Sequence, residues 1–372
     1  MEPNFASGDA IMPRAILLLS VLLAACSAGS PPAADGGTLP GSSDASARPD
    51  ASVRADASAA LPPDAATTAT PDASTTAGSD AASLPALPLV TGDGTFAIAG
   101  RGESTIQVVV PPSRPAHPPL LIAFHCTGGE PTDMVVDFDL EAQAEAHGFV
   151  AIAPRAGYRG TAHPADVDHS ADSGGSSWNM WTASPDANED LRYVRSLIDA
   201  ASASWGADVT RVYTLGFSNG AFFAWFVAAS MPERIAGFAE NSGGWTTDAW
   251  PTRYDVDENS LYLMSTTAAA GQAMTCADLF ADAAFPAACR VTAGNLLRPP
   301  TPASRVPFGY LGHYSADDTV SSAWSCLLAE GLGARAQTRI RASETDGTTG
   351  HTPMPGFLDA AWTFFAGRTN AQ

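Results

Sequence analysis

Lysine is absent from this 372-residue chain, and all 19 of its basic residues are arginine. The 39 acidic residues outnumber them and give a formal net charge of −20. A protein that binds nucleic acid neutralises phosphates with clustered lysine and arginine, and no such cluster occurs along this sequence. The composition therefore argues against a nucleic-acid partner.

The apolar run at residues 15–25 is too short to span a bilayer but has the length of a signal-peptide core. It ends in Leu-Ala-Ala-Cys26, which resembles the lipobox of bacterial lipoproteins, where the cysteine is lipidated. We expect residues 1–26 to be a signal peptide and the protein to be exported and lipid-anchored at a bacterial envelope. The alternative is an ordinary secretory signal with a chance cysteine. If translation begins at Met12, the run is preceded by Met-Pro-Arg, which is more typical of the basic start of a signal peptide than residues 1–14.

Cysteine is scarce, with five residues in all. If Cys26 is lipidated, four remain, and an even count in an exported chain indicates disulfides. Cys276 and Cys289 lie close together in one irregular region and form the favoured pair. Cys126 and Cys326 follow by elimination, with free buried thiols as the alternative for these two.

Residues 27–88 have almost no side chain that a core could bury. They consist mainly of Ala, Ser, Thr, Pro, Gly and Asp, and the tripeptide Asp-Ala-Ser recurs in them. Proline and net negative charge keep such a segment extended, and it buries too little to offset its ordering entropy. We expect a disordered linker that ends where a folded domain, residues 89–372, begins.

The rest of the chain alternates apolar strands with amphipathic helices, which predicts a mostly parallel α/β sheet. An antiparallel pair is expected to come first, and residues 246–303 read as an irregular insertion. The expected strands are 95–98, 105–110, 120–124, 149–154, 211–215, 237–240, 308–311 and 337–341, and the expected helices are 138–147, 189–205, 221–231 and 355–366.

The pentapeptide Gly216-Phe217-Ser218-Asn219-Gly220 lies between an expected strand and an expected helix. This strand–turn–helix order is the setting in which a GxSxG sequence presents a nucleophilic serine. A turn this tight strains the serine backbone, so the residues two before and two after it must lack a Cβ atom. Ser218 is therefore the candidate nucleophile.

A serine nucleophile needs a histidine base and an acid that orients the base. In α/β hydrolases, the acid follows a late strand and the histidine precedes the last helix. Asp317 and Asp318 follow the expected strand at 308–311, and His351 lies just before the final expected helix. The order Ser, Asp, His is complete.

These stretches are similar to the extracellular polyhydroxybutyrate depolymerase and feruloyl or acetylxylan esterase family of α/β hydrolases, over residues 104–367. The resemblance implies an α/β-hydrolase fold and a Ser218–His351–Asp317 triad that cleaves esters through an acyl-enzyme. The family pattern His-Gly-x-x-Asp-x-x-Val selects Asp317 over Asp318. The matching stretches are residues 121–129, 178–181, Asp190, 211–220, 313–320, 350–351 and 362–365.

The sequence departs from the family beside the expected oxyanion hole. The family has His-Gly after its first core strand, whereas this chain has His125-Cys126. The resemblance implies that the backbone N–H groups of Thr127 and Asn219 bind the oxyanion, with Cys126 as the alternative to Thr127. The departure leaves the substrate open between a polyester, a feruloylated or acetylated polysaccharide and a small ester.

Three tryptophans, Trp178, Trp181 and Trp245, lie on loops beside the expected site. They form either a platform for substrate or a cap on the core. The His and Asp residues of 163–172 fit no metal-ligand spacing, and residues 255–266 fail the EF-hand pattern. No metal or organic cofactor is implied.

The sequence therefore predicts a monomeric serine esterase whose partner is an ester substrate, small or polymeric. Its contact with a membrane is expected through the lipid anchor alone. Two alternatives remain: a serine peptidase on the same fold, and a non-catalytic surface binding protein.

Overall fold

The computed structural model describes nine ranges of the chain. They are residues 84–157, 177–180, 185–244, 272–281, 306–315, 317, 319–320, 322–342 and 350–371. The expected signal peptide, Cys26, the linker up to residue 83 and most of the expected insertion lie outside them. Within these ranges, no helix combines the length and apolar character that crossing a membrane requires.

The described strands form one sheet in the order β1-β2-β4-β3-β5-β6-β8-β9-β7. The strands from β4 to β9 in this order run parallel, whereas β1 and β2 at one edge and β7 at the other pair antiparallel. Their bounds are β1 Gly92–Ile98, β2 Gly102–Val109, β3 Leu120–Phe124, β4 Val150–Pro154, β5 Val212–Phe217, β6 Gly237–Asn241, β7 Ala273–Met274, β8 Phe308–Tyr314 and β9 Ala336–Arg341.

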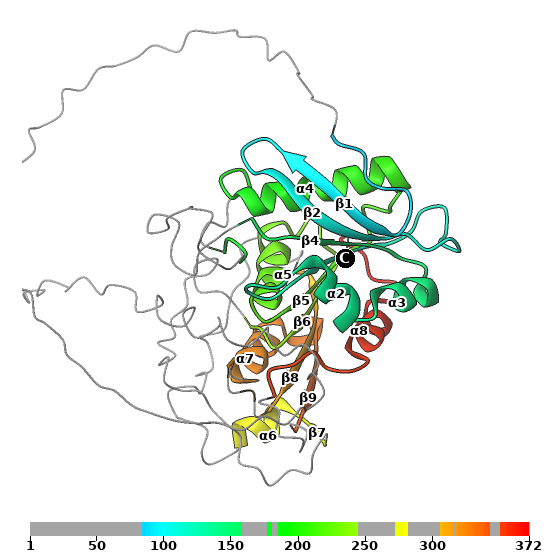
Figure 1. Ribbon diagram of the computed structural model, residues 1–372. Helices are drawn as coiled ribbons and strands as arrows, with labels where there is room; N and C mark the ends of the chain where they lie inside the picture. Colours follow the sequence, from blue (N-terminus) through cyan, green and yellow to red (C-terminus); the bar gives the residue numbers. More distant parts are fainter. Residues whose placement is uncertain are drawn as a thin grey trace, which may run out of the picture. The chain divides into compact units, whose positions relative to one another are not determined.

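Helices cover both faces of this sheet (Figure 1). One core cluster packs α4, α5 and α7 against it, and a second packs α2, α3 and α8 against the other face. A mostly parallel sheet with an antiparallel start and helices on both faces is the α/β-hydrolase fold that the sequence predicted. The helix bounds are α2 Pro131–Asp137, α3 Leu140–His147, α4 Glu189–Trp205, α5 Asn219–Ser230, α6 Cys276–Ala281, α7 Ser322–Leu332 and α8 Phe357–Phe365, and a 3-10 turn, η6, spans Gly333–Arg335.

Local sequence accounts for the best-defined elements. Every residue of β3 is buried, as its continuous apolar run requires. Helix α4 begins where the Asn188 side chain accepts hydrogen bonds from the backbone of Asp190 and Leu191, and it ends at Gly206 in a left-handed conformation. These signals place α4 at the residues that the sequence predicted.

Three helices, α2, α6 and α7, the short strand β7 and part of β8 were not predicted; α6 and β7 lie within residues 246–303, which the sequence read as irregular. Helix α2 is a single short segment that starts at Pro131. In α7, buried serines such as Ser325 interrupt the apolar pattern that periodicity detects. Strand β8 also continues past Leu311 through His313 and Tyr314, which the sequence placed in a loop.

The predicted disulfide pairs are wrong. Cys276 of α6 bonds to Cys326 of α7, with 5.4 Å between their Cα atoms. Cys126 is disulfide-bonded as well, and therefore not to Cys326. Proximity in sequence favoured Cys289, which lies outside the described residues, but α6 packs beside α7 in space. That packing, rather than loop length, sets the Cys276–Cys326 pair.

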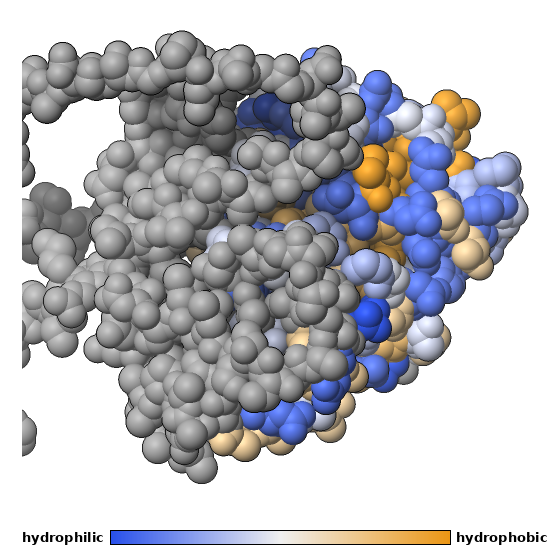
Figure 2. Space-filling model, turned by 60° about the horizontal axis from the view of Figure 1, so that its bottom comes forward, coloured by the Kyte–Doolittle hydropathy of each residue, from blue (hydrophilic) through white to orange (hydrophobic). Residues whose placement is uncertain are grey.

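The exposed large apolar residues in the described ranges are few. On the side shown in Figure 2, hydrophobic and hydrophilic residues are interspersed. Single exposed apolar side chains are ordinary on a folded protein, so they indicate no docking surface. The large exposed apolar residues in the described ranges are Leu84, Leu89, Val90, Val136 and Val209.

Candidate active site

The turn between β5 and α5 has the strained backbone that the sequence predicted. Ser218 has φ 54° and ψ −120°, a conformation that residues with a Cβ atom rarely adopt. Its backbone N–H donates to the Asn241 carbonyl at 3.0 Å, which holds the turn to the end of β6. The serine hydroxyl is therefore fixed at the carboxyl end of the sheet, above the N-terminus of α5.

The two glycines of the pentapeptide are required by close backbone contacts. A Cβ atom on Gly216 would lie 1.9 Å from the Gly220 carbonyl oxygen. One on Gly220 would lie 2.0 Å from the Phe124 carbonyl oxygen and 2.5 Å from that of His125. The second contact also shows that the end of β3 packs directly on the first turn of α5.

Replacing Gly220 with alanine is expected to destabilise the fold by about 3 kcal/mol or more, because backbone atoms cannot move away from the added methyl group. Urea unfolding measures this free energy. Gly333→Ala is the matched control: its φ is 56° and no atom lies within 4 Å of its Cβ position. The control should lose only about 1 kcal/mol, the cost of a left-handed backbone. Equal losses in the two variants would contradict the packing described here.

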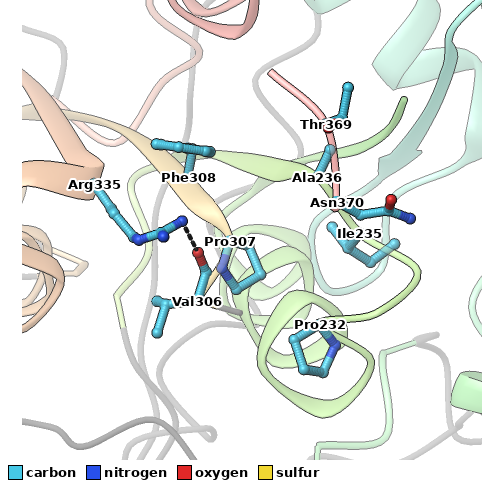
Figure 3. Close-up of a pocket in the computed structure, with 9 residues that line it drawn as sticks. All are labelled: Pro232, Ile235, Ala236, Val306, Pro307, Phe308, Arg335, Thr369 and Asn370. Atoms are coloured by element: carbon cyan, nitrogen blue, oxygen red, sulfur yellow. Dashed lines mark hydrogen bonds between the residues drawn. The ribbon is translucent and has the colours of Figure 1, made fainter. Parts of the chain in front are cut away.

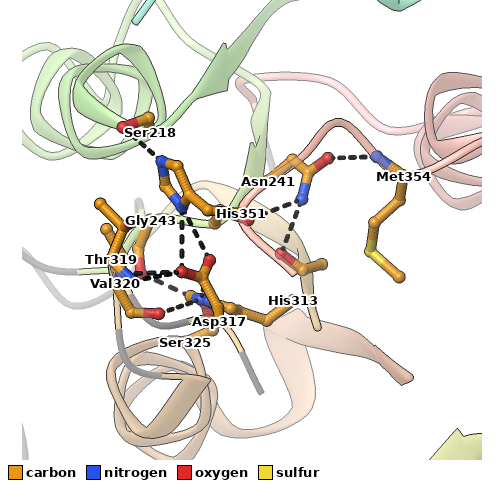
Figure 4. A network of polar contacts seen from close by, with 12 residues as sticks. Ser218, Asn241, Gly243, His313, Asp317, Thr319, Val320, Ser325, His351 and Met354 are labelled. Atoms are coloured by element: carbon orange, nitrogen blue, oxygen red, sulfur yellow. Dashed lines mark hydrogen bonds and ion pairs between the residues drawn. The ribbon is translucent and has the colours of Figure 1, made fainter. Parts of the chain in front are cut away.

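Ser218, His351 and Asp317 form one hydrogen-bonded line (Figure 4). Ser218 Oγ lies 3.0 Å from His351 Nε2, and His351 Nδ1 lies 2.8 Å from Asp317 Oδ2. All three side chains are buried. Because Nδ1 faces a carboxylate, it carries the ring proton, and Nε2 is left to accept the serine proton.

The Asp317 carboxylate is held by backbone and side-chain donors together. Its Oδ1 accepts hydrogen bonds from the backbone N–H groups of Thr319 at 2.9 Å and Val320 at 2.8 Å. Burial alone would raise its pKa, but hydrogen bonds from His313 and His351 outweigh burial and hold the pKa of Asp317 well below its ordinary value. Asp317 is therefore ionised at neutral pH.

Asn241, which the sequence reasoning missed, ties the histidine loop to the serine turn. Its carbonyl accepts from Ser218, as above, and its side-chain Oδ1 accepts from the Met354 backbone at 2.7 Å. The Phe217 ring packs against His351, with ring centroids 5.0 Å apart. The signal was present in the sequence: a polar side chain at the carboxyl end of a buried strand, beside the nucleophile's strand.

The expected oxyanion donors lie on the two backbones that meet at Gly220. Asn219 is the first residue of α5, so its N–H has no acceptor within the helix. Thr127 is buried in a tight turn in which Gly129 N–H donates to the Cys126 carbonyl at 3.1 Å and Gly128 has φ 75°. Their role as donors to an oxyanion stays a prediction.

His125 fixes this turn where the family has His-Gly. Its Nδ1–H donates to the Cys126 carbonyl at 2.6 Å, and its Nε2 accepts from the Ala156 backbone at 3.0 Å. Complete burial lowers the pKa of His125 to about 4, so the ring is neutral at pH 7. The Cys126 carbonyl therefore points toward His125 and Gly129 in a fixed orientation.

Trp178 caps the core and forms no substrate platform. It is 1% exposed, and its ring stacks on Phe223 at a centroid distance of 4.8 Å. Its indole N–H donates to the His125 carbonyl at 2.9 Å, and its backbone N–H donates to the Asn219 side chain at 3.0 Å. Trp178 thus connects the segment after β3 to the first turn of α5, the two segments that carry the expected oxyanion donors. Trp181 and Trp245 lie outside the described residues.

A buried ion pair supports the segment that carries Trp178. Asp190 accepts from Arg101 Nε at 2.9 Å and from the Asn179 backbone at 2.8 Å, and both charged side chains are almost fully buried. Asp190, one of the residues that carry the family resemblance, is therefore a structural anchor next to the site.

A small cavity of about 10 Å³ lies at the amino-terminal ends of the neighbouring strands β6 and β8 (Figure 3). Phe308, the first residue of β8, and Val306, which precedes the strand, line it together with residues just before β6. Ser218 follows the carboxyl end of β5, so the cavity is remote from the candidate site, and it has room for about one water molecule.

In the ranges that the structure describes, no group of three or more His, Cys, Asp or Glu side chains could hold a metal ion. The residues at 163–172 and 255–266, which the sequence analysis considered as metal ligands, lie outside these ranges.

No family model matches the chain. Several curated proteins are similar to part of it, among them two esterases. A bifunctional acetylxylan esterase/xylanase from Neocallimastix patriciarum is 28% identical over 138 residues, or 37% of this chain and 18% of that protein. Feruloyl esterase B from Talaromyces stipitatus is 25% identical over 142 residues, or 38% and 36%. Their names are those of the esterase classes that the sequence resemblance indicated.

The chain spans well under half the length of these two relatives. Among solved structures, the acetyl xylan esterase from Aspergillus awamori aligns with a TM-score of 0.48 and 19% identity, over 74% of this chain and 100% of that one.

Proposed function

We propose that this protein is a serine esterase that hydrolyses carboxylic esters through a covalent acyl-enzyme. The observation that carries the proposal is the line from Ser218 Oγ through His351 to the Asp317 carboxylate. The strained turn that holds Ser218 supports it. So do the partial similarities to proteins named as esterases.

In the proposed acylation step, Ser218 Oγ attacks the ester carbonyl carbon while His351 Nε2 takes the hydroxyl proton. The carbonyl oxygen becomes an oxyanion, which the N–H groups of Asn219 and Thr127 bind. The carbon–oxygen bond to the leaving group then breaks, and His351 gives its proton to the departing alkoxide. Water repeats the sequence on the acyl-enzyme and releases the acid.

The environment of each group favours this chemistry. The Asp317 carboxylate keeps His351 in the tautomer that can accept the serine proton and stabilises the imidazolium that follows. The N-terminus of α5 adds its positive dipole end at the reacting centre. No step needs a metal or an organic cofactor.

For the substrate, we propose acetyl or feruloyl esters of a polysaccharide, or a hydroxyalkanoate polyester. The named relatives favour the polysaccharide esters. We also propose export and a lipid anchor at Cys26, which the apolar run before it and the Cys276–Cys326 disulfide support. A complete triad favours an enzyme over a non-catalytic binding protein.

The test is a hydrolysis panel on the purified protein, with Ser218→Ala as the blank. We expect turnover of p-nitrophenyl acetate at about 1–10³ s⁻¹. Release of acetate from acetylated xylan, of ferulate from methyl ferulate, or of hydroxybutyrate from polymer films then identifies the substrate class. Folded protein that cleaves none of these esters would contradict the proposal, and cleavage of peptide anilides alone would favour a peptidase.

A further inference from the structure

The side-chain hydroxyl of Thr127 has no partner, although it lies on a residue of the expected oxyanion hole. Thr127 is 3% exposed, and its buried Oγ1 makes no hydrogen bond to any described residue. An unpaired buried hydroxyl costs free energy, so its presence in a folded protein calls for an explanation. Asn219 Nδ2, on the other expected donor residue, is also buried without a partner among these residues. Unpaired polar atoms thus lie on both segments that carry the expected donors.

The two unpaired groups differ in their freedom to turn. The Asn219 side-chain Oδ1 accepts from the Trp178 backbone N–H at 3.0 Å, and this bond fixes the orientation of the amide group. The Thr127 hydroxyl has no such bond. Its hydrogen can therefore rotate about the Cβ–Oγ1 bond and turn toward an acceptor that binds beside it.

The turn that carries Thr127 is held in place by several contacts. The Cys126 carbonyl accepts from His125 Nδ1 at 2.6 Å and from the Gly129 backbone N–H at 3.1 Å, and Cys126 itself is disulfide-bonded. The end of β3, just before this turn, packs on Gly220 in the first turn of α5. A donor that stabilises a transition state needs a backbone fixed in this way.

A single threonine can offer two donors to one acceptor. In its gauche rotamers, Oγ1 lies on the same side as the backbone nitrogen of the same residue, so the N–H and O–H groups can converge. An ester carbonyl oxygen has two lone pairs, which the N–H groups of Thr127 and Asn219 would occupy. The oxyanion of the tetrahedral intermediate has a third lone pair, and the Thr127 hydroxyl is a further donor beside the expected N–H groups.

We propose that the Thr127 hydroxyl is a catalytic group, which donates a third hydrogen bond to the oxyanion during acyl transfer. The inference rests on the proposed esterase function and adds a side chain to the two backbone N–H groups. No covalent bond forms or breaks at Thr127, and its proton stays on Oγ1 throughout. Because the third lone pair appears only as the oxyanion forms, this hydrogen bond is stronger in the transition state than in the bound ester. It should therefore raise kcat rather than lower KM.

Thr127→Val in the full chain tests the hydroxyl alone. Valine keeps the branched shape and the backbone N–H, and a methyl group replaces the hydroxyl. We expect kcat for p-nitrophenyl acetate to fall about 10²-fold with KM unchanged, the usual loss for one oxyanion donor. Thr127→Ser keeps the hydroxyl, and its kcat should stay within about threefold of the wild-type value.

Unfolding in urea separates this role from a structural one. A hydroxyl without a partner adds no hydrogen bond to the fold, so the urea midpoint of Thr127→Val should equal or exceed the wild-type midpoint. Thr214→Val is the matched control, because Thr214 is also fully buried but its hydroxyl donates to the Ala224 carbonyl at 3.1 Å. This control should lower the midpoint and keep kcat within about twofold of wild type. If Thr127→Val keeps kcat, changes only KM or fails to fold, the inference is wrong.

A second measurement does not depend on turnover. Phenylboronic acid can add to a serine hydroxyl and become tetrahedral, with an oxygen where the oxyanion would form. Its dissociation constant, measured by calorimetry, should rise about tenfold or more in Thr127→Val and stay unchanged in Thr214→Val. Equal affinities in the wild-type protein and Thr127→Val would refute the inference. If the wild-type protein cleaves no ester and binds no boronate, the proposed function fails as well; if Thr127→Val is as active as wild type, the inference alone fails.

Discussion

Ser218→Ala is expected to lower kcat for p-nitrophenyl acetate about 10⁶-fold, as loss of the serine does when a triad acts as a unit. Without Oγ, no acyl-enzyme can form, and His351 has no hydroxyl proton to take. The fold should survive, because the hydroxyl contacts only His351 Nε2 among the described residues. Steady-state kinetics with equal circular dichroism spectra would establish both points.

Ser196→Ala is the matched control for this substitution. The Ser196 hydroxyl donates to the Arg192 carbonyl within α4, at 2.9 Å, and has no part in the triad. Its kcat should stay within about twofold of the wild-type value, as is usual for substitutions away from the site. If Ser218→Ala kept even a few per cent of turnover, the assignment of the nucleophile would be wrong.

Asp317→Asn is expected to lower kcat by about 10⁴-fold, because it changes the tautomer of the base. The carboxylate accepts from His351, from His313 and from two backbone N–H groups. An amide has one acceptor oxygen and two donor hydrogens, so its NH₂ group faces other donors. His351 then moves its proton to Nε2, where it blocks transfer from Ser218.

Asp318→Asn is the control that the sequence itself supplies. Asp318 was the alternative acid, and it lies outside the described residues. Its substitution by asparagine removes one negative charge, as Asp317→Asn does. Its kcat should stay within about threefold of wild type, an ordinary effect for a substitution off the site. A larger loss from Asp318→Asn than from Asp317→Asn would reverse the choice of acid.

Much of the fold could be predicted because local signals and burial agree. Helix α4 has a side-chain cap, an apolar stripe and a terminal glycine, and the structure places it at the predicted residues. Strand β3 also has its predicted bounds, since a continuous apolar run between turns has few other solutions. The spacing of Gly216, Ser218 and Gly220 follows from sterics alone, and the structure shows the close contacts that require it.

The parts that were missed depend on packing between distant segments. Cys276 pairs with Cys326 because α6 and α7 pack together, and no local pattern reveals that contact. Trp178 read as a loop residue, yet it is enclosed by Phe124 and Phe223 from two other elements. A tryptophan outside helices and strands carries no signal that separates a surface platform from a core cap.

The buried residues His313 and Glu240 show the same limit. The sequence placed His313 in a loop, whereas it is the sixth residue of β8 and points at Asp317. Glu240 follows three apolar residues in β6, and only the sheet register reveals that neighbouring strands enclose it on both sides. A charged residue in a predicted buried strand is therefore a signal worth following, because burial must change its protonation or give it a partner.

The central claim is that Ser218 is a nucleophile activated by His351, and covalent labelling tests it most directly. The purified protein is treated with a fluorophosphonate, and the modified peptide is identified by mass spectrometry. We predict one label, on Ser218, that is absent from Ser218→Ala and forms far more slowly in His351→Ala. Folded protein that takes no label, or takes it on another residue, would contradict the account.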